Sequence, residues 1–340
     1  MFERVFKLSE HKTTVKTEVM AGITTFMTMA YILAVNPSVL GSTGMDTTAV
    51  LLATALASCL GTLCMAFMAN LPFALSAGMG LNAFMAYTVV AGYGYSWQVA
   101  LLAVFIEGLI FIVLSLTNIR EAIFNAIPLT LKKGVSVGIG LFIAFIGLQN
   151  SGLCVDSATL VGIISFPENF HTAGICALLT LIGLFFTAVF YTRKMKGAIL
   201  YGILLTWILG MICQVTGLYV PTPDAGFYSL FPSWGMTDFS KLGLTFGQCF
   251  NVDFSAVGIV NFIVVIFSFL FVDIFDTLGT LIGVATKAKM LDKDGKLPGI
   301  KPALLADSIA TSAGCNSGYF RPPPPLLSPH PALQSAAVPA

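Results

Sequence analysis

Two aspartates, Asp273 and Asp276, stand inside a long apolar segment of this sequence. Apolar residues begin near Val257 and continue beyond Asp276 as far as Ala285, so the segment is long enough to cross a bilayer. A carboxylate at membrane depth is energetically costly, and it therefore usually marks a site for a substrate, an ion or a proton. The spacing of three residues places both carboxylates on one face of a helix.

Two chemical roles are open to these carboxylates. One of them can accept a hydrogen bond from an N–H group of a ligand, and the other can carry a coupling proton. The spacing alone does not say which aspartate has which role. An alternative, in which both are helix-terminal carboxylates at the membrane interface, is disfavoured because apolar residues flank them on both sides.

A second unusual segment, residues 70–84, contains Pro72, Gly78, Gly80 and Asn82 within one apolar stretch. A regular helix tolerates proline and glycine poorly, and irregular backbone at membrane depth needs protein groups or a watery cavity to satisfy it. The cluster therefore predicts a discontinuous helix whose N-terminal N–H groups point at a ligand, with the Asn82 amide beside them. The alternative is that the glycines only allow close packing of helices.

Other candidate residues carry less information. Glu107 is a third acid within an apolar segment, and we interpret it as a structural helix contact because no polar residue accompanies it. The seven cysteines show no metal-ligand spacing, and His11, His171 and His330 have no neighbours typical of a metal site. The sequence therefore predicts no metal site, and no nucleophile–base constellation suggests an enzyme.

Composition sets the class of the protein. Hydrophobic residues make up 56% of the 340 residues and charged residues only 10%, whereas a typical soluble domain has about 25% charged residues. The fold class predicted is an all-α polytopic membrane protein that lies in the lipid bilayer. A net charge of +1 gives no reason to expect a nucleic-acid partner.

Hydropathy predicts about eight membrane-crossing segments, near residues 19–40, 48–69, 73–91, 97–117, 134–150, 171–192, 197–217 and 255–285. Basic residues gather before the first segment and in alternate loops after it: Arg4, Lys7, Lys12, Lys16, Arg120, Lys132, Lys133, Arg193, Lys194, Lys196, Lys287, Lys289, Lys293, Lys296 and Lys301. The intervening loops carry mainly acids: Asp46, Asp156, Glu168, Asp224 and Asp238, with Lys241. This alternation predicts a multi-pass protein of the cell (inner or plasma) membrane, with a cytoplasmic N-terminus.

Three motifs resemble those of one transporter family. Residues 21–37 read Ala-Gly-Ile-Thr-Thr-Phe-Met-Thr-Met-Ala-Tyr-Ile-Leu-Ala-Val-Asn-Pro, residues 78–84 read Gly-Met-Gly-Leu-Asn-Ala-Phe, and residues 271–280 read Phe-Val-Asp-Ile-Phe-Asp-Thr-Leu-Gly-Thr. They resemble the first, third and eighth spans of the AzgA-like purine permeases, the hypoxanthine/guanine and adenine permeases of the nucleobase–cation symporter-2 group. The resemblance extends from about Met1 to Gly314.

The resemblance implies a fold of two inverted repeats of seven spans each, with a core domain and a gate domain. It implies import of purine nucleobases by proton symport, with no cofactor, and it weakly implies a homodimer. It places Gly80 and Asn82, with the motif glycine Gly78, and also Asp273 and Asp276, around the purine. A purine suits these groups, because its ring N–H groups match a carboxylate and its acceptors match backbone N–H groups and the Asn amide.

The same resemblance suggests how the chain is divided. It predicts a cytoplasmic segment over residues 1–18, the first repeat over 19–217, an external loop over 218–254 and the start of the second repeat, with a cytoplasmic loop, over 255–314. Residues 315–340 are rich in proline and cannot continue a membrane helix.

We expect the tail over 315–340 to be a frameshifted translation. Family members continue here with a pattern like Val-Glu-Ser-Ala-Ser-Gly-Val-Ala-Glu, which carries a substrate-binding glutamate. Plausible codons for that pattern, read one base out of register, give the string found at 326–334, Leu-Leu-Ser-Pro-His-Pro-Ala-Leu-Gln. A genuine Pro-rich linker is the alternative.

Two rival functions remain open at this point. One is an anion carrier of related fold, which the two acids disfavour because they would repel an anion. The other is a truncated and inactive remnant of a purine permease, because such a chain would lack most of the second repeat.

Overall fold

The computed structural model describes residues 6, 13–117, 119–157, 160–195, 197–222, 227–232, 238–253, 257–287, 290, 297, 299–316 and 326–327. The chain forms two compact units. The first unit comprises residues 1–139 together with 237–340, and the second comprises residues 140–236. Several positions named above, including His11, His330, Lys289 and most of the tail over 315–340, lie outside the described residues.

The first unit is mostly helical, and every residue of interest for function lies in it. Its helices and strands are α2 (Val15–Met29), α3 (Ile32–Gly41), α4 (Thr47–Cys64), η1 (Met65–Ala69), β1 (Phe73–Ala74), α5 (Met79–Ala83), η2 (Phe84–Gly92), α6 (Trp97–Leu116), α7 (Ile119–Ala126), η5 (Phe239–Leu244), η6 (Gln248–Phe250), α11 (Ile259–Lys287), α12 (Ile300–Asn316) and β4 (Leu326–Leu327). Helix α8 (Leu129–Asn150) begins in this unit and ends in the second.

Six helical segments among the described residues are long and apolar enough to span a membrane. They are Val15–Gly41, Thr47–Ala69, Trp97–Leu116, Phe170–Thr192, Ala198–Val215 and Ile259–Thr277. Two shorter apolar helices, Met79–Gly92 and Val137–Asn150, occupy the third and fifth spans predicted from hydropathy. The prediction of an all-helical polytopic membrane protein is confirmed, whereas the inverted repeats and their boundaries stay a prediction.

The third predicted span is discontinuous, as its glycines and proline indicate. Helix η1 ends at Ala69, and the next residue, Asn70, has a left-handed φ of 49°. The chain then forms the short strand β1 before helix begins again at Met79. The hydroxyl of Thr62 on α4 donates to the Leu75 carbonyl over 3.2 Å and accepts from the Leu75 N–H over 3.0 Å. These bonds satisfy backbone that has left the helix, which is the condition for irregular structure at membrane depth.

Strand β1 pairs in antiparallel register with β4, Phe73 opposite Leu327 and Ala74 opposite Leu326. Strand β4 belongs to the proline-rich tail, and no helix follows α12 among the described residues. The pairing satisfies part of the backbone of β1 and shows that the two leucines of the tail reach the irregular part of the third span.

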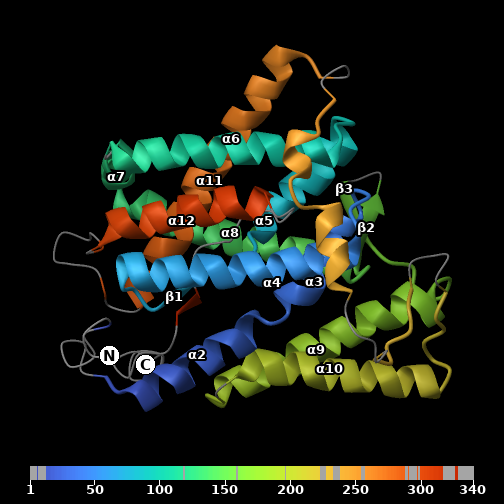
Figure 1. Ribbon diagram of the computed structural model, residues 1–340. Coiled ribbons are helices and arrows are strands. Elements are labelled where there is room, and N and C mark those ends of the chain that lie inside the picture. The colour runs from blue at the N-terminus through green and yellow to red at the C-terminus, as the bar shows by residue number, and fades with distance from the viewer. Residues whose placement is uncertain are drawn as a thin grey trace. The chain divides into compact units, whose positions relative to one another are not determined.

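Helix α12 packs against both α4 and α6 (Figure 1). Glycines make the close approach possible: a Cβ atom at Gly61 of α4 would lie 3.0 Å from the Cβ of Ala310, and one at Gly108 of α6 would lie 2.6 Å from the Ser312 hydroxyl. Hydropathy does not predict this helix, because Lys301, Asp307 and several serines and threonines lower its mean apolar character. Packing against the neighbouring helices, rather than local hydropathy, stabilises this segment as a helix.

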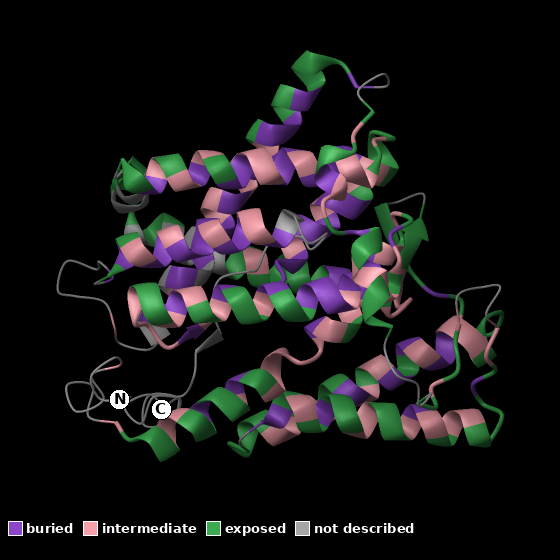
Figure 2. Cartoon of the chain, in the orientation of Figure 1, coloured by how far each residue is buried: buried purple, intermediate pink, exposed green. Residues whose placement is uncertain are grey.

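The core of the first unit joins α5, η2, α6 and α11. Leu81, Met85 and Phe269 are almost completely buried in one hydrophobic cluster, and the rings of Phe84 and Phe269 meet edge to face with centroids 5.2 Å apart. Buried residues recur along α12, whereas exposed and intermediate residues predominate on α9 (Ile175–Thr192) and α10 (Ala198–Val215) (Figure 2). The cluster holds α5 next to the stretch of α11 that carries the two aspartates.

The second unit contains the antiparallel pair β2 (Cys154–Ser157) and β3 (Leu160–Ile163), followed by η3 (Phe170–Gly174) and the hairpin of α9 and α10. Two glycines set the spacing of the hairpin, because a Cβ atom at Gly183 would overlap the Thr206 hydroxyl and one at Gly202 would overlap the Thr187 hydroxyl. Such contacts between small residues are typical of helices that pack within membranes.

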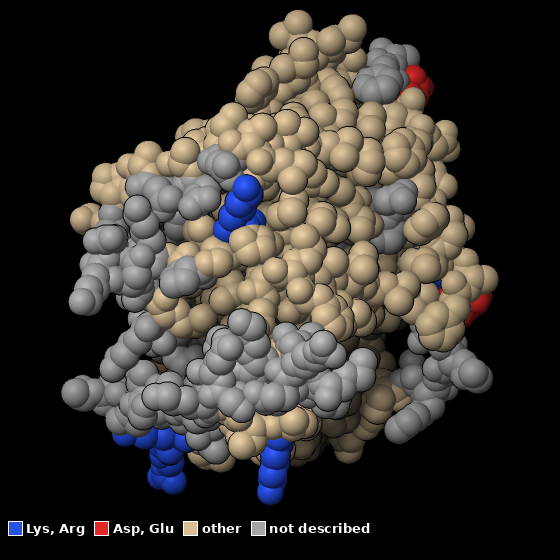
Figure 3. Space-filling view, turned by 60° about the vertical axis from the view of Figure 1, so that its left-hand side comes forward, with Lys and Arg blue, Asp and Glu red and all other residues tan. Residues whose placement is uncertain are grey.

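Charged side chains are few on the face drawn in Figure 3, where most described atoms belong to uncharged residues. Large apolar side chains such as Phe67, Leu184 and Phe267 are more than 60% exposed. Because soluble proteins rarely expose wide apolar patches, these side chains are expected to face lipid.

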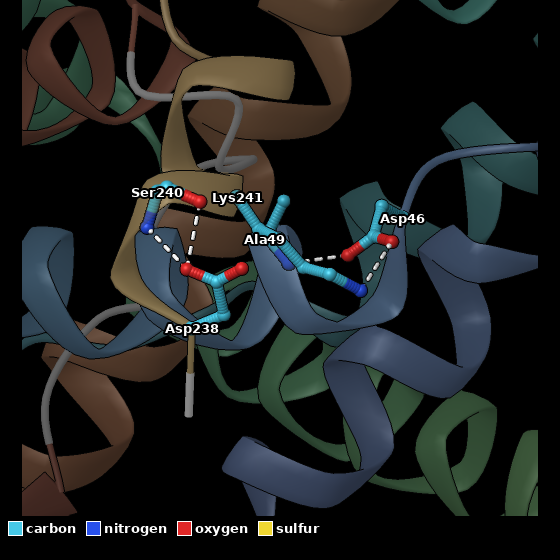
Figure 4. A network of polar contacts seen from close by, with 5 residues as sticks. All are labelled: Asp46, Ala49, Asp238, Ser240 and Lys241. Atoms are coloured by element: carbon cyan, nitrogen blue, oxygen red, sulfur yellow. Dashed lines mark hydrogen bonds and ion pairs between the residues drawn. The ribbon is translucent and has the colours of Figure 1, made fainter. Parts of the chain in front are cut away.

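One ion pair outside the spans joins η5 to the start of α4. Asp46 caps α4 by accepting from the Ala49 N–H over 2.9 Å, and Lys241 of η5 reaches the same carboxylate over 3.3 Å (Figure 4). The Ala49 N–H and Lys241 hold the pKa of Asp46 below its usual value. The Ser240 hydroxyl and N–H likewise lower the pKa of Asp238, which caps η5.

Candidate functional site

The first unit buries several polar and acidic side chains. Its described helices bury Asn36, Thr54, Asn82, Glu107, Asp273, Asp276, Thr277 and Asp307, each at most 9% exposed. A buried polar group normally has a hydrogen-bond partner, and in a membrane helix it commonly marks a substrate or ion pathway. The site can therefore be built from the contacts of these groups.

Asn82 lies in the first turn of α5, the helix that follows the break. Its own N–H donates to the Gly78 carbonyl over 2.8 Å, and its side chain is completely buried. Gly78 is buried and Gly80 is half-buried on the same short segment. The structure therefore brings the three residues of the third-span motif together at the point where the helix begins.

The side chain of Asn82 belongs to a buried hydrogen-bonded chain. Its Nδ2 donates to Oδ1 of Asn36 on α3, and Nδ2 of Asn36 donates to the Thr54 hydroxyl on α4 over 2.8 Å. The Thr54 hydroxyl in turn donates to the Val50 carbonyl over 2.6 Å. Oδ1 of Asn82 is buried and has no hydrogen-bond partner among the described residues.

Asp273 and Asp276 lie on α11, which contacts α5. Asp273 is completely buried, and the Thr277 hydroxyl lies 3.4 Å from its Oδ1. Phe269, one turn before Asp273, packs against Phe84, two residues after Asn82. The elements that carry the predicted site residues therefore adjoin, and the expected burial of both aspartates is observed.

Sequence reasoning missed Asp307, which lies on α12 and is 2% exposed. Ile274 and Phe275, which flank Asp276 on α11, pack against the same hydrophobic cluster as Ala306 of α12, so the two acids lie on neighbouring stretches of helix. The missed signal is the helical spacing of Asp307 with two small residues: Ala303 and Ala310 lie four residues before it and three after it, and all three are buried. The low hydropathy of this stretch hides that spacing.

Sequence reasoning also missed Asn36 and Thr54. Asn36 stands before Pro37 in an apolar span, and the cost of burying an amide could have marked it in the way that cost marked the aspartates. Thr54 gives no such signal, because threonines in membrane helices commonly bond to the carbonyl four residues earlier.

Glu107 on α6 is completely buried beside Gly108, the glycine against which α12 packs. That location agrees with a helix contact, although its structural role stays a prediction. Elsewhere, Nδ1 of His171 lies 3.1 Å from the Leu218 carbonyl in the second unit. No group of three or more His, Cys, Asp or Glu side chains within the described ranges could hold a metal ion.

The chemistry available here is that of hydrogen-bond acceptors. The carboxylates of α11 and the amide oxygen of Asn82 all accept hydrogen bonds, and aromatic and aliphatic side chains surround them. Such a set fits a small, flat and mostly apolar ligand that presents several N–H donors.

The chain is similar to a family of membrane permeases. The model of the xanthine/uracil permease family, described as "Permease family", matches residues 16–323.

Several curated relatives are named for purine transport. The adenine permease AdeP of Escherichia coli is 40% identical over 319 residues, which cover 92% of this chain and 66% of that protein. The guanine/hypoxanthine permeases PbuO and PbuG of Bacillus subtilis are 42% and 44% identical, and each match covers 92% of this chain and 69% of the relative. The chain thus spans about two thirds of the length of these curated relatives.

Proposed function

Because this chain belongs to the xanthine/uracil permease family, we propose that it carries purine nucleobases, namely hypoxanthine, guanine or adenine, across the cell membrane. The observation that carries the proposal is the identity of 40–44% to adenine and guanine/hypoxanthine permeases over more than nine tenths of the chain. The family is one of permeases, so the chain is a transporter and not an enzyme. The resemblance predicted from the three motifs is confirmed.

In this proposal the purine lies where α5 adjoins α11. Asp273 accepts an N–H of the purine, and the amide of Asn82 forms a second hydrogen bond with it. Gly78 and Gly80 allow the ligand to approach the backbone where helix begins. Burial of Asp273 and Asn82 supports these roles, because a hydrogen bond to a buried carboxylate is stronger than one between neutral groups.

We further propose that transport is a symport with protons and needs no cofactor. Asp276 is the candidate carrier of the coupling proton, since its neighbour Asp307 makes two simultaneous charges unfavourable. A protonated carboxyl on one of them removes the repulsion. Inverted repeats, a cytoplasmic N-terminus and a homodimer complete the proposal and derive from the resemblance and the charge pattern.

The anion carrier is the less favoured alternative. Three buried carboxylates in the first unit, Asp273, Asp276 and Asp307, would repel an anion, and the named relatives carry nucleobases. The inactive remnant of a permease stays open as a second alternative, because the chain spans about two thirds of those relatives.

Uptake in bacteria that lack their own purine permeases tests the proposal. Cells that express this chain, and cells that express it with the reading frame of the tail restored, receive radiolabelled hypoxanthine or adenine. We expect saturable uptake that is reduced by competition from unlabelled purines and abolished by a protonophore. If neither protein takes up or binds a purine although both reach the membrane, the proposal is wrong, and uptake by the restored protein alone identifies the present chain as a remnant.

A further inference from the structure

The hydrogen-bonded chain from Asn82 to Val50 has a defined direction. It links three helices, because Asn82 lies on α5, Asn36 on α3, and Thr54 and Val50 on α4. All four residues are completely buried. Water therefore does not compete for these groups, and each bond depends on the one next to it.

A backbone carbonyl sets this direction. The Val50 carbonyl can only accept, so the Thr54 hydroxyl uses its single hydrogen to donate to it over 2.6 Å. The Thr54 oxygen is then an acceptor for Asn36, and the group of Asn36 that faces it over 2.8 Å must be the Nδ2 donor. Oδ1 of Asn36 consequently faces Asn82 and receives a hydrogen bond from its Nδ2.

The same direction determines what Asn82 can offer a ligand. Its Nδ2 is engaged by Asn36, whereas its Oδ1 is buried without a partner among the described residues. If this series of hydrogen bonds only stabilised packing, Oδ1 of Asn82 would be expected to accept a hydrogen bond within the protein, since an unpaired buried acceptor is costly. A ligand N–H would satisfy it.

We propose that Asn36 and Thr54 are positioning residues that hold the Asn82 amide in one orientation, so that Oδ1 of Asn82 accepts a hydrogen bond from an N–H of the bound purine. This inference rests on the proposed function and deepens it. It assigns Asn82 as an acceptor and not a donor. It also predicts that the site selects purines with an N–H at that position over analogues that lack it.

Thr54→Val tests the orientation without touching the ligand. Valine has nearly the shape of threonine but cannot accept the bond from Asn36. The linked amides of Asn36 and Asn82 then gain by turning round together, because an oxygen of Asn36 faces the valine in place of an N–H group, and the displaced donor, Nδ2 of Asn82, lies where a ligand can satisfy it. Asn82 would then present Nδ2 to the purine, so that the competent orientation becomes a minor population.

The experiment measures equilibrium binding to the full chain in detergent, with radiolabelled hypoxanthine as the probe. Unlabelled hypoxanthine and analogues with one N–H each blocked by a methyl group compete for the site. Thr54→Ser, which keeps the hydroxyl, is the rescue variant. Thr180→Val is the matched control, because the Thr180 hydroxyl donates to the Cys176 carbonyl over 2.9 Å in the same way but lies in the second unit.

We expect Thr54→Val to weaken hypoxanthine binding by about five- to twentyfold and to reduce the discrimination against one methylated analogue. Thr54→Ser and Thr180→Val should retain both the affinity and the discrimination. Asn36→Ala should reproduce the loss, and it serves as the second variant if Thr54→Val is poorly folded. Folding is followed by the thermal unfolding midpoint without ligand, which a merely structural role would lower while leaving discrimination intact.

Two results overturn the inference, and they differ from each other. If the unaltered chain binds hypoxanthine while Thr54→Val and Asn36→Ala keep its affinity and discrimination, the orientation of Asn82 is not set by these residues, although the proposed function stands. If the unaltered chain binds no purine at all, the proposed function fails for this chain and the inference fails with it.

Discussion

At the scale of single residues, burial separates the acids of the spans from those of the loops. Asp273 is completely buried in a helix that adjoins the broken third span, whereas Asp46 is partly exposed and paired with Lys241 outside the spans. The first can act on a ligand away from water, and the second stabilises a helix start. Predictions for the two therefore concern different quantities, affinity for one and stability for the other.

Asp273→Asn should weaken purine binding by about ten- to a hundredfold. The change keeps the shape of the side chain but removes its charge, and with it a charge-assisted hydrogen bond worth about 1.5–3 kcal/mol. Competition by unlabelled purines measures the affinity, corrected for the amount of protein in the membrane. Glu107→Gln is the control, since we interpret that buried acid as structural. If Glu107→Gln abolished uptake while Asp273→Asn kept the affinity of the unaltered protein, the wrong carboxylate would have been chosen.

Asp46 should give the protein a pH-dependent stability in acid. Its folded pKa is lowered, first by the Ala49 N–H and then by Lys241. A lowered folded pKa means that the stabilisation is complete above the ordinary value near 4 and is lost as the pH falls through the folded value. Thermal unfolding of Asp46→Ala should therefore show a loss of about 1 kcal/mol at pH 7 that disappears in strong acid.

Asp46→Asn is the matched control for that measurement. Asparagine is as good an N-cap as aspartate but does not titrate, so it should keep most of the stability at pH 7 and lose the dependence on pH. Equal losses for Asp46→Ala and Asp46→Asn at every pH would contradict the capping explanation.

At the scale of elements, glycines decide which helices approach closely. Gly61 and Gly108 admit α12 beside α4 and α6, and Gly183 and Gly202 receive the threonines of the facing helix in the hairpin of α9 and α10. In a bilayer the hydrophobic effect does not drive helices together, because lipid tails are as apolar as the side chains. Close packing between small residues and the facing side chains therefore matters more here than in a soluble protein.

Gly183→Ala should destabilise the hairpin of α9 and α10 by about 1–3 kcal/mol, because the added methyl group would overlap the Thr206 hydroxyl. The double variant Gly183→Ala, Thr206→Ala should recover much of that loss. Gly147→Ala, with open space around its new Cβ atom, is the control. Unfolding midpoints in detergent measure the effect, and an equal response of Gly183→Ala and Gly147→Ala would rule out the steric explanation.

At the scale of the whole molecule, topology follows from charge. Lys194 stands in a loop predicted to be cytoplasmic, and Leu160 stands in one predicted to be external; both side chains are exposed. In a cysteine-free background, an impermeant thiol reagent should label cysteine at position 160 from outside the cell and leave cysteine at position 194 unlabelled. The opposite pattern would invert the proposed orientation.

The tail provides the other prediction at this scale. Resequencing the gene should reveal one or two bases, inserted or lost near the codons for residues 315–325, whose correction opens a long apolar frame with the pattern of a tenth span. The physical reason is that the proline-rich string cannot continue a membrane helix. An intact gene with no permease-like frame beyond it would disprove the frameshift.

Much of this protein follows from the sequence by itself. Hydropathy predicts the long apolar helices, since a bilayer requires them, and the position of Asp273 and Asp276 within one of these segments predicts their burial. The cluster of Pro72, Gly78 and Gly80 predicts the broken helix that begins again at Met79. These signals are local, and each can be recognised within one segment.

Tertiary structure alone decided the rest. Asn36 and Asn82 lie 46 positions apart, and only the packing of α3, α4 and α5 reveals that they share a hydrogen bond whose direction starts at the Val50 carbonyl. Asp307 likewise acquires meaning only when α12 packs against α4 and α6. The physical reason is that burial cost belongs to one residue, whereas the direction of a hydrogen bond depends on which partner the fold brings within reach.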